Sequence, residues 1–380
     1  MRILYVFNSL AIWGGVERIL VDKMNSLVKM YHDDVYIITT DQGRHPIPYY
    51  LESEVHVEDF NISFHSQYHF HGVQRLMFLI KNMNLFERLL TERINDYKPD
   101  VIVCTTAYYV HSLIKVKSHI PLVVESHSIY SYTIYGKGFL KQIWEWLLKK
   151  NLKKADVIVA LTEADANTWS EYYPHVITIP NMVHLNETGK FSDNIQQKVL
   201  FVGRFDYQKR VFEIIEIWRM LQTIFPNWEL HIYGDGPLGE ELHNNVQGHR
   251  DNIIIHKPTS AIFECYINSA FLVMTSLFEP FGLVMPEAMS CGLPVISYDV
   301  PYGPASIITD GKDGFLIKDN DRKAFADKMA LLMNNLELRQ QMGKQAIISS
   351  QRYSAVNIMP MWKDLFKELV DCHNNENNAT

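Results

Sequence analysis

Two glutamates, Glu279 and Glu287, stand in an E-x7-E arrangement around a predicted junction between a strand and a helix. Residues 270–275 are apolar enough for a buried strand, and residues 282–291 have helical spacing, with Pro286 tolerated in the first turn. Backbone amides at a helix start favour a phosphate, and carboxylates accept hydrogen bonds from sugar hydroxyls. The pair therefore indicates a site for an anion and a polyol together, although a favourable charge at a helix start is the alternative.

A pair of cations follows the first strand that is predicted in the second half of the chain. Arg204 and Lys209 flank a loop between the apolar run at 199–203 and a helical segment. A guanidinium binds phosphate through two parallel hydrogen bonds, and an ammonium acts as a point charge. The sequence therefore predicts that Arg204 and Lys209 hold a diphosphate. Arg210 adds a third charge, to which the sequence assigns no role.

His127 and the glycines Gly14 and Gly15 are the candidates in the first half. His127 follows the apolar run at 122–124, which places it at the carboxyl edge of a parallel sheet, where open α/β sheets bind ligands. Gly14 and Gly15 stand between a predicted strand and a helix, where the missing side chains let a ligand approach the helix N-terminus. A packed histidine and a tight turn with positive φ are the alternatives.

The string Glu279-Pro-Phe-Gly-Leu-Val-Met-Pro-Glu287, followed by Ala-Met-Ser-Cys-Gly, resembles the E-x7-E motif of the retaining GT4 glycosyltransferases. Residues 203–209 are similar to the family's G-R-x4-K motif, although Arg210 stands where the family commonly has glycine. Gly-Gly-Val-Glu-Arg from Gly14 is similar to the family's N-terminal glycine loop. The resemblance covers nearly the whole chain and implies an α/β protein of the GT-B fold, with two Rossmann-like parallel-sheet domains facing a central cleft.

The resemblance also implies roles for these residues. Arg204, Lys209 and the amides near Gly282 would hold the diphosphate and stabilise its charge as it leaves. Glu279 would bind hydroxyls of the sugar, and Glu287 those of the ribose.

His127 would contact the sugar from the opposite domain. The implied course is a front-face, ion-pair-like transition state in which the departing phosphate helps to deprotonate the acceptor. The residues expected to act in catalysis are His127, Arg204, Lys209 and Glu279. Those expected to bind the donor are Gly14, Gly15, Gly234, Pro258, Phe281, Gly282, Leu283 and Glu287.

The implied activity is transfer of a hexose from a nucleotide-diphosphate sugar, with UDP as the expected nucleotide, to a saccharide or lipid-linked saccharide in surface glycan biosynthesis. No metal is expected, because no acidic pair is placed to bind one, and the nucleotide sugar is a co-substrate and not a cofactor. Two other classes remain open. A hydrolysing sugar-nucleotide epimerase of the same fold would turn over without an acceptor, and a non-catalytic sugar-nucleotide-binding protein would not turn the donor over.

Two motifs suggest other chemistry. Residues 234–239 spell G-x-G-x-x-G, which suggests a dinucleotide site. They follow the second predicted strand of their half, and the next strand ends in His256 instead of a carboxylate for a ribose, so a dehydrogenase is disfavoured. Residues 65–71 hold three histidines with no acidic or cysteine residue nearby in the sequence, so a surface loop is favoured over a metal site. The resemblance places this aromatic region at the acceptor pocket.

Short apolar runs alternate with amphipathic segments in both halves, which predicts two parallel sheets. The expected strands are 3–7, 35–39, 101–105, 122–124 and 157–161 in the first half, and 199–203, 229–233, 252–256, 271–275 and 294–298 in the second. The expected domains are an acceptor-binding one at 1–183, joined by a C-terminal helix at about 356–372, and a donor-binding one at 184–355. Residues 373–380 are expected to be disordered.

The chain of 380 residues, 47% of them hydrophobic, is long enough for two domains with full cores. A net charge of -7 and a pI near 6.1 argue against non-specific nucleic-acid binding. The four cysteines match neither a zinc spacing nor a disulfide framework. With no signal-peptide pattern at the start and no apolar run of membrane-spanning length, a cytoplasmic location is expected.

Residues 139–154 have the pattern of an amphipathic helix with a basic end. Trp144 and Leu148 are expected in the core and the lysines in solvent. Such a segment can also lie on an anionic membrane surface, so a peripheral contact at the inner face of the membrane remains open.

Overall fold

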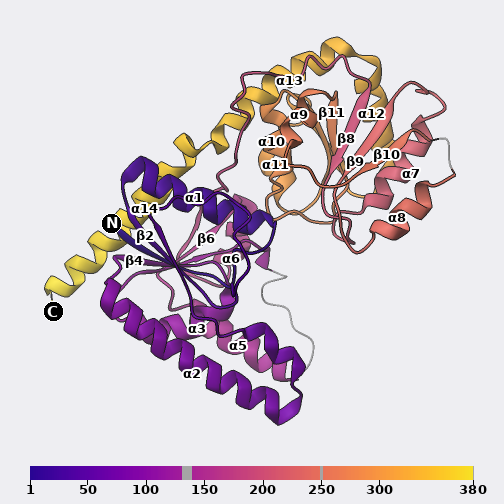
Figure 1. Ribbon diagram of the computed structural model, residues 1–380. Helices are drawn as coiled ribbons and strands as arrows, with labels where there is room; N and C mark the ends of the chain where they lie inside the picture. The colour runs from indigo at the N-terminus through magenta and orange to yellow at the C-terminus, as the bar shows by residue number, and fades with distance from the viewer. Residues whose placement is uncertain (131–138, 249–250, 380) are drawn as a thin grey trace. The chain divides into compact units, whose positions relative to one another are not determined.

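The computed structural model describes residues 1–130, 139–248 and 251–379. Contacts within the chain divide it into two compact units (Figure 1). Unit 1 consists of Met1–Met182 and Ile358–Thr380, and unit 2 consists of Val183–Asn357.

Unit 1 is built on a seven-stranded parallel sheet with the order β3-β2-β1-β4-β5-β6-β7. The predicted strands of the first half are confirmed, because their aliphatic runs are buried as expected for parallel strands covered on both faces. The edge strands β3 and β7 were not predicted, since β3 is half polar and partly exposed and β7 has only three residues. The strands are β1 (Arg2–Val6), β2 (Asp34–Thr39), β3 (Val55–Asp59), β4 (Val101–Cys104), β5 (Leu122–Glu125), β6 (Val157–Ala160) and β7 (Val176–Thr178).

Helices cover both faces of this sheet. In Figure 1, α1 (Gly15–Tyr31) lies on one side, together with the long C-terminal helix α14 (Ala355–Ala379). The other side carries α2 (Gly72–Tyr97), α3 (Ala107–Val116) and α5 (Phe139–Leu152). Their buried side chains form one core with the sheet and with α6 (Glu163–Ser170). A short 3-10 helix, η1 (Phe64–His69), precedes α2.

The C-terminal helix is tied to unit 1 by charge. Lys363 of α14 contacts the carboxylate of Asp33 at 2.6 Å, and the N-terminal amine of Met1 contacts the same carboxylate at 2.9 Å. The helix continues through Ala379 and so includes the polar residues 373–379, for which disorder was expected. Extension of an existing helix needs no new nucleation, and this polar segment contains neither proline nor glycine.

Unit 2 contains a six-stranded parallel sheet with the order β10-β9-β8-β11-β12-β13. All five strands predicted for the second half are present, so the two Rossmann-like sheets are confirmed. The strands are β8 (Lys198–Val202), β9 (Glu229–Tyr233), β10 (Ile253–His256), β11 (Phe271–Met274), β12 (Val295–Asp299) and β13 (Gly314–Lys318). The helices are α7 (Val211–Leu221), α8 (Gly239–Val246), α9 (Ile262–Ile267), α10 (Val284–Ser290), α11 (Gly303–Ile307), α12 (Arg322–Asn334) and α13 (Leu336–Ser350).

The strand order reverses once in each sheet, beside β1 and β4 in unit 1 and beside β8 and β11 in unit 2. Open α/β sheets bind ligands outside the carboxyl ends of the strands at such a reversal. Asn8 and Thr106 follow the two strands in unit 1, and Arg204 and Glu279 follow those in unit 2. Each fold therefore places candidate residues at its own switch point.

Candidate active site

Glu279 lies in the loop between β11 and α10, and its carboxylate is buried. The Oε1 atom accepts hydrogen bonds from Lys209 Nζ and Ser276 Oγ, each at 2.5 Å. The backbone is held as well, because the amides of Tyr302 and Gly303 donate to the Glu279 carbonyl. Unit 2 thus brings together two predicted residues from different motifs, and it adds Ser276, which was not predicted.

Arg204 stands apart from this pair. Its side chain is 71% exposed, and its nearest carboxylate is that of Asp206 at 3.7 Å. The loop after β9 supports the Arg204 loop, because a Cβ atom at Gly234 would lie 1.9 Å from the carbonyl oxygen of Gly203. A Cβ atom at Gly236 would lie 2.6 Å from the carbonyl oxygen of Phe205. The G-x-G-x-x-G string therefore has a packing cause, and it follows the second strand of its unit as predicted.

Arg210, which had no predicted role, joins three loops at the carboxyl edge of the unit 2 sheet. Its guanidinium donates to the carbonyls of Thr275 and Ser276 and to Asp319, and it lies 5.0 Å from the centre of the Tyr298 ring. Its φ of 47° falls in the left-handed region that glycine adopts readily. Arg210 therefore fixes the loop that carries Lys209.

Glu287 lies on α10, and its carboxylate is also buried. It accepts a hydrogen bond from the Tyr266 hydroxyl at 3.3 Å. The two glutamates of the E-x7-E motif thus differ in their partners, since Glu279 contacts an ammonium and Glu287 a phenol.

The segment between the glutamates is held by packing. Gly282 has a φ of 94°, where a side chain would be strained, and a Cβ atom there would meet Met285 at 2.5 Å. Phe281 is buried edge-on against Tyr353, with ring centres 5.2 Å apart. A donor contact from Phe281 would therefore come from its backbone. Leu283 precedes α10 and makes no side-chain cap.

Three stacked rings lie on the neighbouring strands β9 and β10 of unit 2. The ring of His256 stacks on Tyr233 with centres 4.2 Å apart and on His231 with centres 5.0 Å apart. Burial lowers the pKa of His256, and His231 lowers it further. This stack ends two residues before Pro258, which is exposed. It offers a flat aromatic surface at the end of β10.

Gly14 and Gly15 mark the start of α1 in unit 1. Gly14 is the N-cap, with an extended φ of -113°, so positive φ does not explain it. A Cβ atom at Gly14 would lie 2.0 Å from the Glu17 carboxylate, which therefore occupies the space at the helix N-terminus. Burial raises the pKa of Glu17, although its own backbone amide and His127 lower it.

His127 ends a buried chain of polar contacts that also includes Lys23 and Glu125. Its Nε2 atom lies 2.9 Å from one oxygen of Glu125, and the other oxygen of Glu125 contacts Lys23 Nζ. Lys23 and Glu125 are 2% and 3% exposed, and Trp362 of α14 covers the ammonium with its ring centre 3.9 Å away. Burial opposes ionisation of Glu125, but Lys23 and His127 outweigh it and lower the pKa of this carboxyl.

The other ring nitrogen of His127, Nδ1, is buried and has no hydrogen-bond partner among the described residues. Because the Glu125 carboxylate accepts from Nε2–H, Nδ1 of the uncharged ring is an acceptor. His127 lines a cavity of about 520 Å³, which Glu17, Asn8 and Thr106 also line. A buried acceptor at a cavity wall is a place for a ligand hydroxyl.

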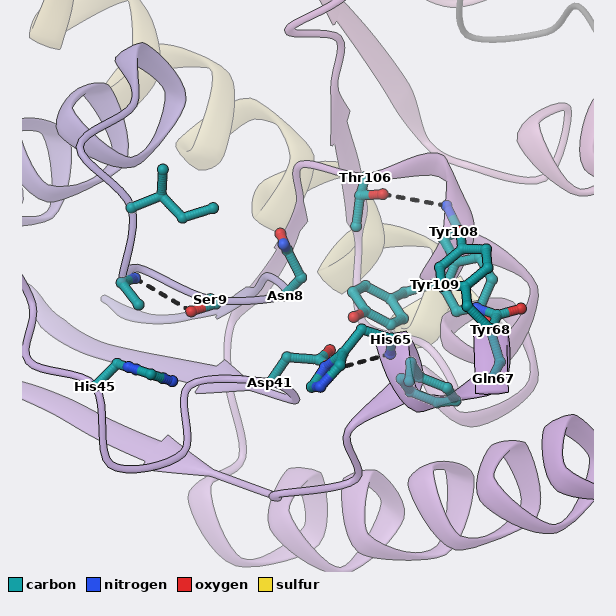
Figure 2. Close-up of a pocket in the computed structure, with 13 residues that line it drawn as sticks. Asn8, Ser9, Asp41, His45, His65, Gln67, Tyr68, Thr106, Tyr108 and Tyr109 are labelled. Carbon is teal, nitrogen blue, oxygen red and sulfur yellow. Dashed lines mark hydrogen bonds and ion pairs between the residues drawn. The ribbon is translucent and has the colours of Figure 1, made fainter. Parts of the chain in front are cut away.

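A second cavity of unit 1, of about 620 Å³, shares Asn8, Thr106 and Tyr108 with the first. We call it the aromatic pocket (Figure 2). It is lined by Asn8, Ser9, Ala11, Ile12, Asp41, His45, Phe64, His65, Gln67, Tyr68, Thr106, Tyr108 and Tyr109. His65 has an acidic partner here, Asp41, which lies 24 positions earlier in the chain. In the described residues, no three histidine, cysteine or acidic side chains are grouped to hold a metal ion.

Two family models match the chain in succession. The model for Glycosyltransferase Family 4 matches residues 13–187, and that for Glycosyl transferases group 1 matches residues 187–348. The chain belongs to the GT4 glycosyltransferases. The enzyme class and the GT-B fold predicted from the motifs are thereby confirmed.

Similar proteins span nearly the whole glycosyltransferase. One is the Campylobacter jejuni GalNAc-alpha-(1->4)-GalNAc-alpha-(1->3)-diNAcBac-PP-undecaprenol alpha-1,4-N-acetyl-D-galactosaminyltransferase, 25% identical over 94% of this chain and 96% of that protein. The amylovoran biosynthesis glycosyltransferase AmsD of Erwinia amylovora is 24% identical over 96% and 99%. A mutant of S. aureus TarM, crystallised with UDP and other ligands, has a TM-score of 0.77 and 17% identity over 96% and 99%.

Several residues of the glycosyltransferase's candidate site were not predicted from the sequence, although the sequence pattern around some of them indicates a buried charge. Glu125 ends an otherwise aliphatic strand, and Lys23 interrupts the apolar face of α1. A charge at either position has to be paired, because an isolated buried charge is strongly disfavoured. The contact of Asp41 with His65 left no such signal.

Proposed function

We propose that this glycosyltransferase transfers a hexose from a UDP-sugar, with retention at the anomeric carbon, to a saccharide or lipid-linked saccharide in bacterial surface glycan assembly. The contact between Lys209 and Glu279 at the switch point of unit 2 carries the proposal. UDP is supported by its presence in the TarM crystals. The acceptor class is supported by the names of the C. jejuni and E. amylovora enzymes.

The diphosphate of the donor binds Arg204 and Lys209. Arg204 is exposed and presents a guanidinium that can bind two phosphate oxygens in parallel. Lys209 has three N–H donors, of which one faces Glu279 and the others remain for phosphate. The two cations stabilise the negative charge that grows on the diphosphate as the bond to the sugar breaks.

Glu279 binds the sugar through Oε2. Both Lys209 and Ser276 donate to Oε1, which leaves Oε2 for a sugar hydroxyl. Oε2 lies on the Gly282 side of the loop, 3.7 Å from where a Cβ atom of that residue would stand. Since the carboxylate is already paired with an ammonium, it acts as a hydroxyl ligand instead of a nucleophile, and no covalent sugar–enzyme intermediate forms.

The remaining donor contacts follow the same reasoning. Glu287, held by Tyr266, accepts from the ribose hydroxyls, and the aromatic stack of Tyr233 and His256 borders the base together with Pro258. His127 accepts a hydrogen bond from a sugar hydroxyl at Nδ1, in the orientation that Glu125 sets.

One experiment tests the proposal against the epimerase and the binding protein. The enzyme is incubated with UDP-hexoses and saccharide acceptors in EDTA, and the anomeric coupling of the product is measured by proton NMR. An α-linked product from an α-linked donor is expected. A β-linked product or loss of turnover in EDTA would contradict the retaining, metal-free course. Turnover of the donor without acceptor would favour the epimerase. A donor that binds but stays intact would favour the non-catalytic binding protein.

We also propose a peripheral contact with an anionic membrane surface at the basic end of α5. Lys149, Lys150 and Lys153 line a cavity of about 440 Å³ with exposed Trp146 and Tyr172. In the described part of the chain, no helix has the length and apolar character needed to cross a bilayer. Leu148 is buried as predicted, whereas the side chain of Trp144 lies outside the described residues.

The membrane contact is tested by sedimentation with vesicles. Each lysine near an anionic surface contributes about 1 kcal/mol of binding free energy. Replacement of the three lysines by glutamate should therefore abolish binding to phosphatidylglycerol vesicles, whereas the exposed control Lys323→Glu should leave it intact. Equal binding of the wild type to neutral vesicles would contradict an electrostatic contact.

A further inference from the structure

The aromatic pocket of unit 1 combines flat rings with hydrogen-bonding groups. Phe64 is buried against Tyr108, with ring centres 5.4 Å apart, and Tyr108 packs edge-on against Tyr109 at the same distance. Tyr68, also in the wall, is 69% exposed and offers its ring to a ligand. In Figure 2, Asp41 and His65 lie between these tyrosines and Ser9.

A chain of hydrogen bonds connects the rings to the polar groups. The buried hydroxyl of Thr40 lies 2.6 Å from the hydroxyl of Tyr109 and donates to Asp41 Oδ2 at 2.6 Å. The other oxygen of Asp41 accepts from the backbone amide of His65 at 3.2 Å and lies 2.7 Å from His65 Nδ1. Asp41 is therefore fixed from three sides before any ligand binds.

This chain determines what His65 presents to the pocket. A carboxylate only accepts hydrogen bonds, so Nδ1 of His65 carries the proton that faces Asp41. The other ring nitrogen, Nε2, is then an acceptor in the uncharged ring. The hydroxyl of Tyr108 has the opposite role, because burial, with the nearby Asp41 carboxylate, raises its pKa to about 12 and keeps it a donor. The pocket thus offers matched acceptors and donors to hydroxyl groups.

The charge of the pocket disfavours an anionic ligand. Among the described residues that line it there is neither lysine nor arginine, whereas Asp41 contributes a carboxylate. The guanidinium of Arg75, which is outside the lining, donates to Gln67 at 3.0 Å and lies over the Tyr68 ring. A phosphate group would therefore face a carboxylate without a free cation in the wall.

We propose that the aromatic pocket binds a neutral pyranose ring of the acceptor and discriminates against acceptors built of polyol phosphate. One face of the sugar packs on Tyr68, and its hydroxyls bond to Asp41, His65 and Tyr108. The inference rests on the proposed function in taking the acceptor to be a saccharide, and it adds the charge class of that acceptor and the residues that select it.

Binding without donor tests the inference directly. Methyl α-glucopyranoside, methyl α-galactopyranoside and their 2-acetamido counterparts are titrated into the whole protein by ligand-observed NMR, in parallel with glycerol 3-phosphate and ribitol 5-phosphate. At least one neutral glycoside is expected to bind more tightly than either phosphate. Asp41→Asn keeps the shape but removes the charge, so glycoside affinity should fall about fivefold, the difference between a charged and a neutral acceptor, while phosphate affinity rises.

Two control variants separate the expected loss of glycoside affinity from a general loss of folding. Asp96→Asn removes an exposed carboxylate elsewhere in unit 1, and Tyr50→Ala removes an exposed tyrosine outside the pocket. Neither should change glycoside binding, whereas Tyr68→Ala should weaken it. Because Tyr68 is exposed, this variant is expected to fold normally.

The outcomes distinguish the pocket from the wider function. Preference for a polyol phosphate, absence of glycoside binding, or unchanged affinities in Asp41→Asn would each overturn the inference. Calorimetry with UDP is run on the same samples. If UDP binds but no glycoside does, the inference about the pocket is wrong and the proposed transferase function is unaffected. If a glycoside binds but UDP does not, the proposed function is wrong and the inference about the pocket is supported.

Discussion

Each unit holds a buried glutamate that bridges a lysine and a second polar side chain, but the two lysines differ in access. In unit 2, the Lys209 side chain beside Glu279 is 19% exposed, and its ammonium can reach a ligand. In unit 1, the Lys23 side chain beside Glu125 is 3% exposed and lies under Trp362. The unit 2 pair can therefore contact a substrate directly, whereas the unit 1 pair acts only through His127.

The difference in access also predicts different energetic behaviour. Removing one partner of a buried pair leaves an uncompensated charge, which is strongly destabilising. A pair with one solvated partner tolerates the loss, because water and counterions screen the remaining charge. The unit 1 pair should therefore govern stability, and the unit 2 pair ligand affinity.

The largest effect is expected for Glu125→Leu. The substitution leaves Lys23 buried without its carboxylate, so the free energy of unfolding should fall by about 3–5 kcal/mol. Urea denaturation followed by circular dichroism measures the change. The double variant Lys23→Met with Glu125→Leu removes both charges and should recover most of the loss. If the free energy of unfolding of Glu125→Leu lay within about 1 kcal/mol of the wild-type value, the two pairs would not differ as proposed.

The second largest effect is expected in unit 2, on the affinity for UDP. Lys209→Ala and Arg204→Ala should each weaken UDP binding by about 1.5–3 kcal/mol, the range for a hydrogen bond to a charged group. Isothermal calorimetry measures this affinity. Glu279→Ala should bind UDP normally but transfer poorly, because its carboxylate serves the sugar. Unchanged UDP affinity in both cation variants would remove them from the site.

The motifs could be predicted from the sequence because each is a local string, and so could the buried strands, which are continuous apolar runs. Contacts between residues of different motifs could not be predicted. Lys209 and Glu279 are 70 positions apart, and only the packing of the loops after β8 and β11 brings them together. Arg210 was left without a role for the same reason, since its partners lie in the loops after β11 and β13.

A smaller effect concerns Glu287, whose buried carboxylate accepts a hydrogen bond from a neutral phenol. Tyr266→Phe removes one neutral donor, so the affinity for UDP should fall by about 0.5–1.5 kcal/mol, whereas Glu287→Ala should lose more. Calorimetry on the two variants gives the order. A Tyr266→Phe loss as large as that of Lys209→Ala would show that a neutral partner matters as much as a cation, and would undo the contrast.

The smallest effect is expected at Glu17, where burial outweighs the favourable groups nearby and raises the pKa of the carboxyl above 4.5. The folded protein then holds this proton more tightly than the unfolded chain. Its contribution to stability is therefore full below the unfolded pKa and is lost as the pH rises through the folded one. Relative to Glu17→Gln, the wild type should lose stability slightly as the pH is raised from about 4 to about 7. Urea denaturation at a series of pH values measures the difference. A wild type that gains stability relative to the variant over this range would mean that the helix N-terminus and His127 dominate, and that Glu17 behaves as a paired charge like Glu125.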